Sequence, residues 1–260
     1  MKRLIKDLRK YADYATYAAR SSLKAEVANS RLNWLWWILD PLLFMFVYMF
    51  IGMIVYREPE QHFALFVFIG LTVWNFFNKT AQASVKLVTG AKSIISKIYL
   101  PKYMLVISKM LTNFVKLLIS FGIVLVMMIA YRVPYTFAML QLIPVLLTLI
   151  AVTFGFSVIL MHFGVFFEDL HNLVQVGLRL VFYLSGVFYS IETRVGDVYG
   201  TLLLKGNPVA LCIDAARTVL IEGGIPQYGW LGLWFGIGVA MSVIGIALVY
   251  RYENSYVKVI

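Results

Sequence analysis

The segment QLIPVLLTLIAVTFGFSVILMHFGVFF, from Gln141 to Phe167, decides the fold class of this chain. It contains no Asp, Glu, Lys or Arg, and most of its residues are large and apolar. About 20 such residues in a helix are enough to cross the hydrocarbon core of a bilayer, which is about 30 Å thick. The segment therefore predicts a transmembrane helix.

The rest of the chain repeats this pattern. The chain has 260 residues, of which 61% are hydrophobic and only 14% are charged, whereas a soluble domain carries about 25% charged residues. Five more apolar runs predict further spans: Trp36 to Tyr56, Phe63 to Val85, Met104 to Tyr131, Leu173 to Ser190 and Tyr228 to Tyr250. We therefore expect an all-α, polytopic membrane protein with six transmembrane helices, folded as a single domain over residues 1–260.

Lysine and arginine gather on one side of the predicted membrane. Sixteen of them lie in the N-terminal segment, in the loop between the second and third spans and in the C-terminal tail, against five in the opposite loops. Cytoplasmic loops carry such an excess, so we expect both termini in the cytoplasm. The net charge of +10 follows from this distribution. The sequence has no basic groove interleaved with aromatic residues, which is the feature that would indicate binding of nucleic acid.

Two segments do not fit simple spans or turns. Residues 1–33 alternate charged, tyrosine and small residues at helical spacing, which predicts an amphipathic helix in the cytoplasmic interface; a solvated helix is the alternative. Residues 191–227 form an external region that is too long for a turn. Within it, Asn207-Pro208 opens a helical pattern that is too short and too charged to span, so we expect a re-entrant helical segment before the last span.

The sequence lacks the residues that catalysis would need. It has no phosphate-binding G-x-x-x-x-G-K-[ST] loop, and its three histidines and Cys212 are isolated from one another. His162, inside the fourth predicted span, is interpreted as a hydrogen-bonded packing residue, with a proton relay as the alternative. All acidic residues lie in loops or near span ends, which argues against ion-coupled transport. We expect no enzyme activity, no metal site and no cofactor bound by this chain.

Four short motifs occur in the order typical of one family of membrane proteins. They are SRLNWLW at 30–36 with DPLL at 40–43, IYLPK at 98–102, FYLSGVFY at 182–189 and NP at 207–208. Together with six spans, this series resembles the transmembrane subunit of bacterial ABC-2 type exporters of lipid-linked polysaccharides, such as O-antigen, capsule or teichoic acid. The resemblance covers essentially the whole chain, although the family usually has proline where Gly186 stands.

The resemblance implies how such a chain works. It implies a homodimer in the bacterial cell membrane, associated with two copies of a cytoplasmic ATP-binding subunit that holds ATP and Mg. It also implies that a lipid-linked glycopolymer passes through a channel between the two membrane subunits. Membrane lipids would be the remaining partners.

In the resembling family, the loop after the second span carries a coupling helix that contacts the ATPase. Residues 90–101, GAKSIISKIYLP, would form it here, with an apolar face of Ile94, Ile95, Ile98 and Tyr99 and a polar rim of Lys92 and Lys97. The predicted ATPase-coupling residues are Ser93, Ile94, Lys97, Ile98 and Tyr99. A positively charged loop packed on lipid headgroups is the alternative.

Aromatic residues are candidates for a polysaccharide path, because the C–H faces of sugars pack on aromatic rings. The candidates are Trp74, Phe77, Phe182, Tyr183, Phe188 and Tyr189. Packing against lipid at the interfaces is the alternative for each of them. Arg31 could contact the pyrophosphate of the carrier lipid, since a guanidinium suits bidentate phosphate binding, or it could anchor to headgroups.

Two other functions fit parts of this pattern. The same six-span plan would serve an ABC-2 exporter of small hydrophobic drugs or lipids, which would show a closed apolar cavity. A non-transporting scaffold or a membrane enzyme would purify without any ATPase subunit.

Overall fold

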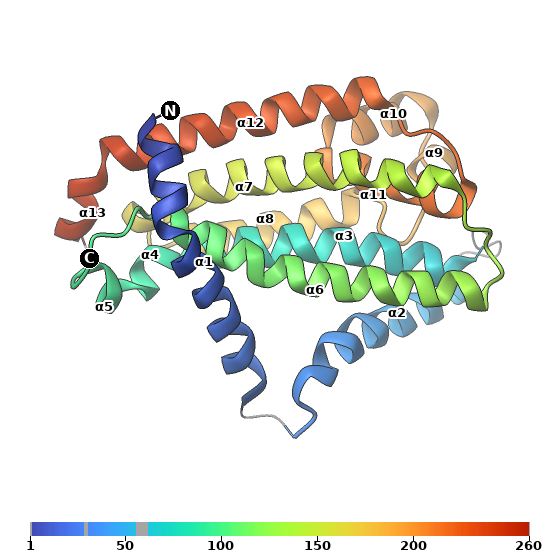
Figure 1. Cartoon of the computed structure of the whole chain (residues 1–260). Helices are drawn as coiled ribbons and strands as arrows, with labels where there is room; N and C mark the ends of the chain where they lie inside the picture. Colours follow the sequence, from blue (N-terminus) through green and yellow to red (C-terminus); the bar gives the residue numbers. More distant parts are fainter. Residues whose placement is uncertain (1, 29–30, 56–61, 260) are drawn as a thin grey trace.

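The computed structural model describes residues 2–28, 31–55 and 62–259. Within these ranges all regular elements are helices or helical turns. Helix α1 (Lys2–Ala28) is followed by a 3-10 turn, η1 (Asn33–Leu35), and by α2 (Trp36–Val55). Figure 1 shows α1 and α2 as the two arms of a V that converge away from the other helices.

The remaining long helices run side by side as a bundle (Figure 1). They are α3 (Phe63–Ser84), α6 (Tyr103–Ala130), α7 (Leu142–Phe166) and α12 (Tyr228–Arg251), with the 3-10 turn η2 (Phe137–Gln141) before α7. Among the described residues, these four helices are the ones long and apolar enough to cross a membrane. Their bounds agree with four of the predicted spans to within a residue at each end.

Helix α3 lies at the centre of the bundle. It packs against α2, α6, α7, α8 and α11, and side chains such as Leu65, Phe68 and Ile69 are fully buried. An apolar helix that is enclosed on all sides is typical of the interior of a helical membrane protein. These five helices are therefore positioned by their contacts with α3, while α12 packs on α7 and α1 packs on α6.

The first and fifth predicted spans are shorter apolar helices. The apolar part of α2 covers Trp36–Gly52, and α8 covers Leu170–Leu184. At 1.5 Å per residue, α8 is about 22 Å long, less than the bilayer core of about 30 Å. It begins three residues before the predicted range, and it ends earlier because the chain turns at Gly186, whose φ of +62° favours glycine. Six spans therefore remain a prediction.

The region 191–227 is largely helical. It contains α9 (Ile191–Arg194), α10 (Asp197–Gly206), α11 (Pro208–Arg217) and a π-helical turn, η3 (Thr218–Glu222). Asn207 caps α11, since its Oδ1 accepts hydrogen bonds from the backbone N–H groups of residues 209 and 210 at 3.0 and 3.3 Å. The helix that Asn207-Pro208 predicts is confirmed, while its depth in a membrane remains a prediction.

The helix expected over residues 90–101 is shorter than predicted. The chain forms two single turns, α4 (Leu87–Gly90) and α5 (Lys92–Ile95), and has no regular structure at Tyr99 and Leu100. Pro101 contributes at the end of this segment, because its ring disfavours helical conformation at Leu100. A last helix, α13 (Glu253–Val259), lies at the same end of the bundle in Figure 1.

Candidate functional site

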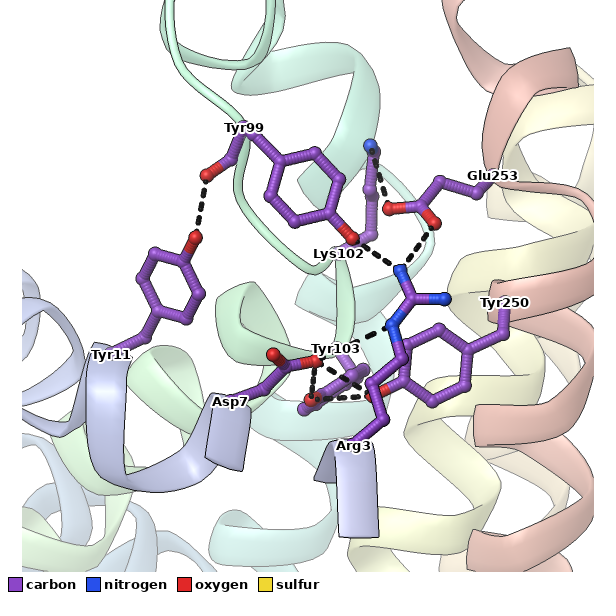
Figure 2. Close-up of polar contacts among 8 residues, drawn as sticks. All are labelled: Arg3, Asp7, Tyr11, Tyr99, Lys102, Tyr103, Tyr250 and Glu253. Carbon is purple, nitrogen blue, oxygen red and sulfur yellow. Dashed lines mark hydrogen bonds and ion pairs between the residues drawn. The ribbon is translucent and has the colours of Figure 1, made fainter. Parts of the chain in front are cut away.

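A polar network joins three parts of the chain at the end of the bundle that we expect to be cytoplasmic (Figure 2). The N-terminal helix α1 contributes Arg3, Asp7 and Tyr11; the segment after α5 contributes Tyr99, Lys102 and Tyr103; the C-terminal end contributes Tyr250 and Glu253. We call these eight residues the cytoplasmic network.

Arg3 is one centre of the cytoplasmic network. Its Nη2 donates to the Tyr99 hydroxyl at 2.6 Å and to Glu253 Oε2 at 3.1 Å, and its guanidinium lies 4.4 Å from the centre of the Tyr250 ring. Glu253 also pairs with the buried Lys102 at 3.9 Å. Arg3 and Glu253 therefore together hold the loop, through Tyr99 and Lys102, and both ends of the chain.

Asp7 is the second centre. Its Oδ2 accepts hydrogen bonds from the hydroxyls of Tyr103 and Tyr250, at 3.2 and 2.9 Å, and these hydroxyls lie 3.0 Å apart. Tyr11 donates to the backbone carbonyl of Tyr99 at 3.1 Å. Because Tyr103 begins α6, any movement of α1 against the loop must also move the base of a long bundle helix.

Tyr99 has a perturbed hydroxyl within this network. Partial burial raises its pKa to about 12, with a further contribution from Glu253, while Arg3 acts in the opposite direction. The hydroxyl therefore stays protonated at physiological pH. It accepts a hydrogen bond from Arg3 without carrying a charge.

The predicted coupling residues form an exposed strip beside this network. Ile94 and Ile98 are 41% and 51% exposed, and Ser93 and Lys97 are also exposed. Ile95, which we expected on the same apolar face, instead turns inward and packs on the cluster that contains Tyr103 and Val88. The strip is thus anchored from beneath by an apolar contact, while its outer face stays free of contacts with the bundle core.

The six aromatic candidates for the path lie in one continuous cluster. Phe182 contacts Trp74, Tyr183 and Phe188, with ring centres 5.3, 5.4 and 5.9 Å apart. Other ring contacts that extend the cluster include Trp74–Phe77, Phe188–Tyr189, Tyr48–Phe188 and Phe77–Phe156. Trp74 and Phe77 are buried, whereas Tyr183 is 58% exposed. Tyr48 and Phe156 are members of this cluster that sequence reasoning missed, because a single aromatic residue in a span gives no signal of its neighbours.

Arg217 is another residue that sequence reasoning missed. Its side chain is buried and donates to the carbonyls of Phe66, Gly186 and Val187 at 3.1, 2.8 and 2.6 Å. In the sequence it counts only as one of the external positive charges. In the structure it fixes the turn after α8, and so one end of the aromatic cluster.

The two remaining single-residue predictions differ in outcome. His162 is buried, and its Nδ1 lies 2.6 Å from the Tyr256 hydroxyl, which agrees with a hydrogen-bonded packing role. Arg31 is exposed in the turn before α2, apart from the cytoplasmic network and the aromatic cluster. Its contact with a lipid phosphate stays a prediction.

These features define a class of protein: a helical multi-pass membrane protein, with long apolar helices and an ordered polar network at one end. The chain is similar to "O-antigen export system permease protein RfbA" of Klebsiella pneumoniae, of which two versions are 23% and 24% identical over 95% of both chains. A protein of the same name from Myxococcus xanthus is 27% identical over 87% of both chains. No family model matches the chain. The similarity confirms the resemblance to polysaccharide-export permeases of the ABC-2 type that the motifs indicate.

Proposed function

We propose that this chain is the membrane-spanning subunit of an ATP-driven ABC-2 type exporter. It moves a lipid-linked polysaccharide of the O-antigen class from the cytoplasm across the cell membrane. The observation that carries this proposal is the similarity to O-antigen export permeases along 87–95% of the chain. Similarity along nearly the whole chain supports a shared architecture, whereas similarity limited to one short motif would not.

The proposed topology has six spans, with α2 and α8 crossing the membrane beside the four long helices. Both termini are cytoplasmic, which the excess of lysine and arginine on that side supports. α8 continues through the turn at Gly186, and the helices of residues 191–227 lie in the outer leaflet. The packing of α11 against α3 and α7 supports this placement, because irregular backbone at membrane depth has to be covered by protein.

The proposed assembly contains two copies of this chain and two copies of a cytoplasmic ATP-binding subunit. The polysaccharide passes between the two membrane subunits, along the aromatic cluster around Phe182. Continuous ring contacts from Trp74 to Tyr189 support this path, because aromatic faces can hold successive sugar rings without fixing their register. In this proposal ATP and Mg are bound by the partner, and the chain itself binds no cofactor.

The proposed contact with the ATPase is the strip that contains Ile94 and Ile98. An exposed pair of isoleucines at a cytoplasmic surface supports this role, since apolar anchors surrounded by polar residues are typical of binding surfaces. Force applied there would reach α6 through the cytoplasmic network. In this proposal the strip, the cytoplasmic network and the start of α6 move together.

The test places a charge on the strip. We expect Ile98→Asp to lower transport-coupled ATPase activity of the reconstituted complex by roughly tenfold or more, because a disrupted interface anchor costs about 2 kcal/mol or more. The matched control is Ile225→Asp, which adds the same charge at an exposed residue before α12. Wild-type assembly and activity in Ile98→Asp would show that this strip is not the coupling contact.

A second candidate function is the export of small hydrophobic molecules. It is favoured by an apolar cavity of about 650 Å³ between α7, α8, α10 and α12, whose lining includes Phe77, Phe156, Leu178, Leu203 and Trp234. Proteoliposomes that export a hydrophobic dye but leave a lipid-linked glycan in place would favour this function. Export of the glycan alone would favour the first.

A further inference from the structure

A second, polar cavity of about 270 Å³ lies where the V of α1 and α2 meets α3 and α6. It is lined by residues from all four helices, including Glu26, Asp40, Lys79, Asn113 and Lys116. Ionisable residues within membrane helices are costly and usually serve a function. Neither the predicted ATPase contact nor the aromatic cluster includes these five residues.

The charges around this cavity are arranged in pairs. Lys79 Nζ lies 2.9 Å from Asp40 Oδ2. Glu26 is paired with Lys116 inside the cavity and with Lys109, at 3.6 Å, just outside it. The cavity lining thus holds two ammonium groups and two carboxylates, and Lys109 beside it adds a third ammonium group. With Lys109 included, the surroundings of the cavity carry an excess of positive charge, which favours an anion.

The depth of the two pairs differs. The side chains of Lys79 and Asp40 are 46% and 41% exposed, whereas that of Lys116 is only 19% exposed. The Lys79–Asp40 pair therefore marks the mouth of the cavity, and Lys116 its interior. An exposed ion pair contributes little stability, so a ligand can separate it at small cost.

Asn113 offers an acceptor that the chain does not use. It is 3% exposed, and its Nδ2 donates to Thr80 Oγ1 at 2.9 Å. Thr80 already donates its own hydrogen to the carbonyl of Phe76, so its oxygen can only accept and the orientation of the amide is fixed. Asn113 Oδ1 is then left buried without a hydrogen-bond partner, which costs about 1–3 kcal/mol unless a ligand or water donates to it.

The wall contributed by α2 is aromatic. Trp36 and Trp37 both line the cavity, next to Asp40. Large aromatic faces bury the apolar C–H surface of a sugar ring, while carboxylate and amide oxygens accept hydrogen bonds from its hydroxyls. Ammonium groups complete the set, because they bind phosphate oxygens.

We propose that this cavity binds the sugar-phosphate head of a lipid-linked glycan, with Lys79 and Lys116 on the phosphate and Asn113, Asp40 and the two tryptophans on the first sugar. The proposal rests on the proposed function and deepens it, because it assigns a place where the head of the substrate is recognised. The size agrees with a single small headgroup, since 270 Å³ is just below the range of ligand pockets, which starts at roughly 300 Å³.

The experiment measures binding to the full chain with its ATPase partner in nanodiscs. The probe is a short isoprenyl diphosphate that carries one hexose, and the comparison ligands are the same isoprenyl diphosphate without sugar and phosphatidylglycerol. We expect Lys116→Met and Lys79→Met each to weaken binding of the glycosylated probe by roughly tenfold or more, because each removes a charge-assisted hydrogen bond. Lys24→Met, an exposed lysine on α1 outside the cavity, should leave binding unchanged.

The outcomes distinguish failure of the cavity assignment from failure of the proposed function. Lys79 is half exposed, so Lys79→Met should fold and keeps the test valid if Lys116→Met does not fold. Equal binding by the wild type and both cavity variants overturns the proposal, and so does equal competition by phosphatidylglycerol or by the sugar-free diphosphate. If the wild type exports a lipid-linked glycan while these variants bind normally, only the assignment of the cavity fails. If the wild type binds the probe but exports no glycan, the proposed function fails.

Discussion

Arg217 shows how one buried charge can organise a large part of this molecule. Its guanidinium donates three hydrogen bonds to backbone carbonyls on α3 and on the turn after α8, and it lies 3.4 Å from the centre of the Phe66 ring. A guanidinium holds five N–H donors in a fixed plane, whereas an ammonium has three donors on a single atom. The turn at Gly186 is therefore held by a residue 31 positions away.

The first prediction concerns this residue. We expect Arg217→Met to lower the free energy of unfolding by more than about 3 kcal/mol, because several charge-assisted hydrogen bonds are lost and carbonyls are left unpaired. Arg217→Lys should recover only part of the loss. The measurement is thermal unfolding in detergent, with Arg20→Met, an exposed arginine on α1, as the control. Unfolding of Arg217→Met at the wild-type temperature would contradict the structural role.

At this scale the sequence predicts residue types better than partners. The cap at Asn207 follows from local chemistry, since a helix start with Asn-Pro needs only its own neighbours. The pairing of Lys116 with Glu26 joins helices that are far apart in sequence, and no local pattern announces it. The same holds for the bond between Arg3 and Tyr99.

At the scale of elements, close contact between α7 and α12 holds one side of the bundle. A Cβ added at Gly238 would lie 2.7 Å from the backbone N of Val152, and one at Gly155 would lie 2.7 Å from the carbonyl oxygen of Gly238. Small residues at such positions let two backbones approach, which is the main source of packing energy between membrane helices. The two glycines thus fix the distance between these helices.

The second prediction tests this contact. We expect Gly238→Leu to push α7 and α12 apart and to destabilise the bundle by about 1–3 kcal/mol or more, as overpacking does. The measurement is the SDS concentration at which the helices of the detergent-solubilised protein unfold. Gly236→Leu is a matched control on the same helix, because a Cβ there meets open space. Equal effects of the two substitutions would show that the change in helix composition is responsible.

The bounds of the long helices could be predicted because hydrophobic length sets them directly. α8 could not be predicted as well, since its end depends on the turn at Gly186 and on the distant Arg217. The loop over 90–101 shows the same limit. Its amphipathic pattern is compatible with one helix, but Pro101 disfavours helical conformation at Leu100, and the Tyr11 hydroxyl donates to the carbonyl of Tyr99, which lies outside the helices.

At the scale of the whole molecule, the cytoplasmic network connects α1, the loop and both C-terminal helices (Figure 2). Lys102 is buried, and burial lowers its pKa while Glu253 acts to raise it. The carboxylate is thus the group that keeps a charged lysine stable beside the loop. The sequence predicted the cytoplasmic location of these segments from charge alone, and gave no indication that they contact one another.

The third prediction follows from this role of Glu253. We expect Glu253→Ala to increase the rate of hydrogen exchange in residues 99–103 by roughly tenfold, because a buried ammonium left without its partner costs about 1–3 kcal/mol. Transport-coupled ATPase activity should fall in parallel, while assembly with the partner persists. Glu222→Ala, at the end of the external turn η3, serves as the control. Unchanged exchange in Glu253→Ala would show that the network does not hold the loop.

The hydrogen bonds that Tyr103 and Tyr250 donate to Asp7 join positions up to 243 residues apart. During synthesis Asp7 emerges first, Tyr103 becomes available with α6, and Tyr250 becomes available only after α12 has left the ribosome. A nascent chain that stops before α12 therefore leaves Asp7 with Tyr103 alone. The complete cluster can form only when the last long helix has been made and its Tyr250 end lies beside the start of α1.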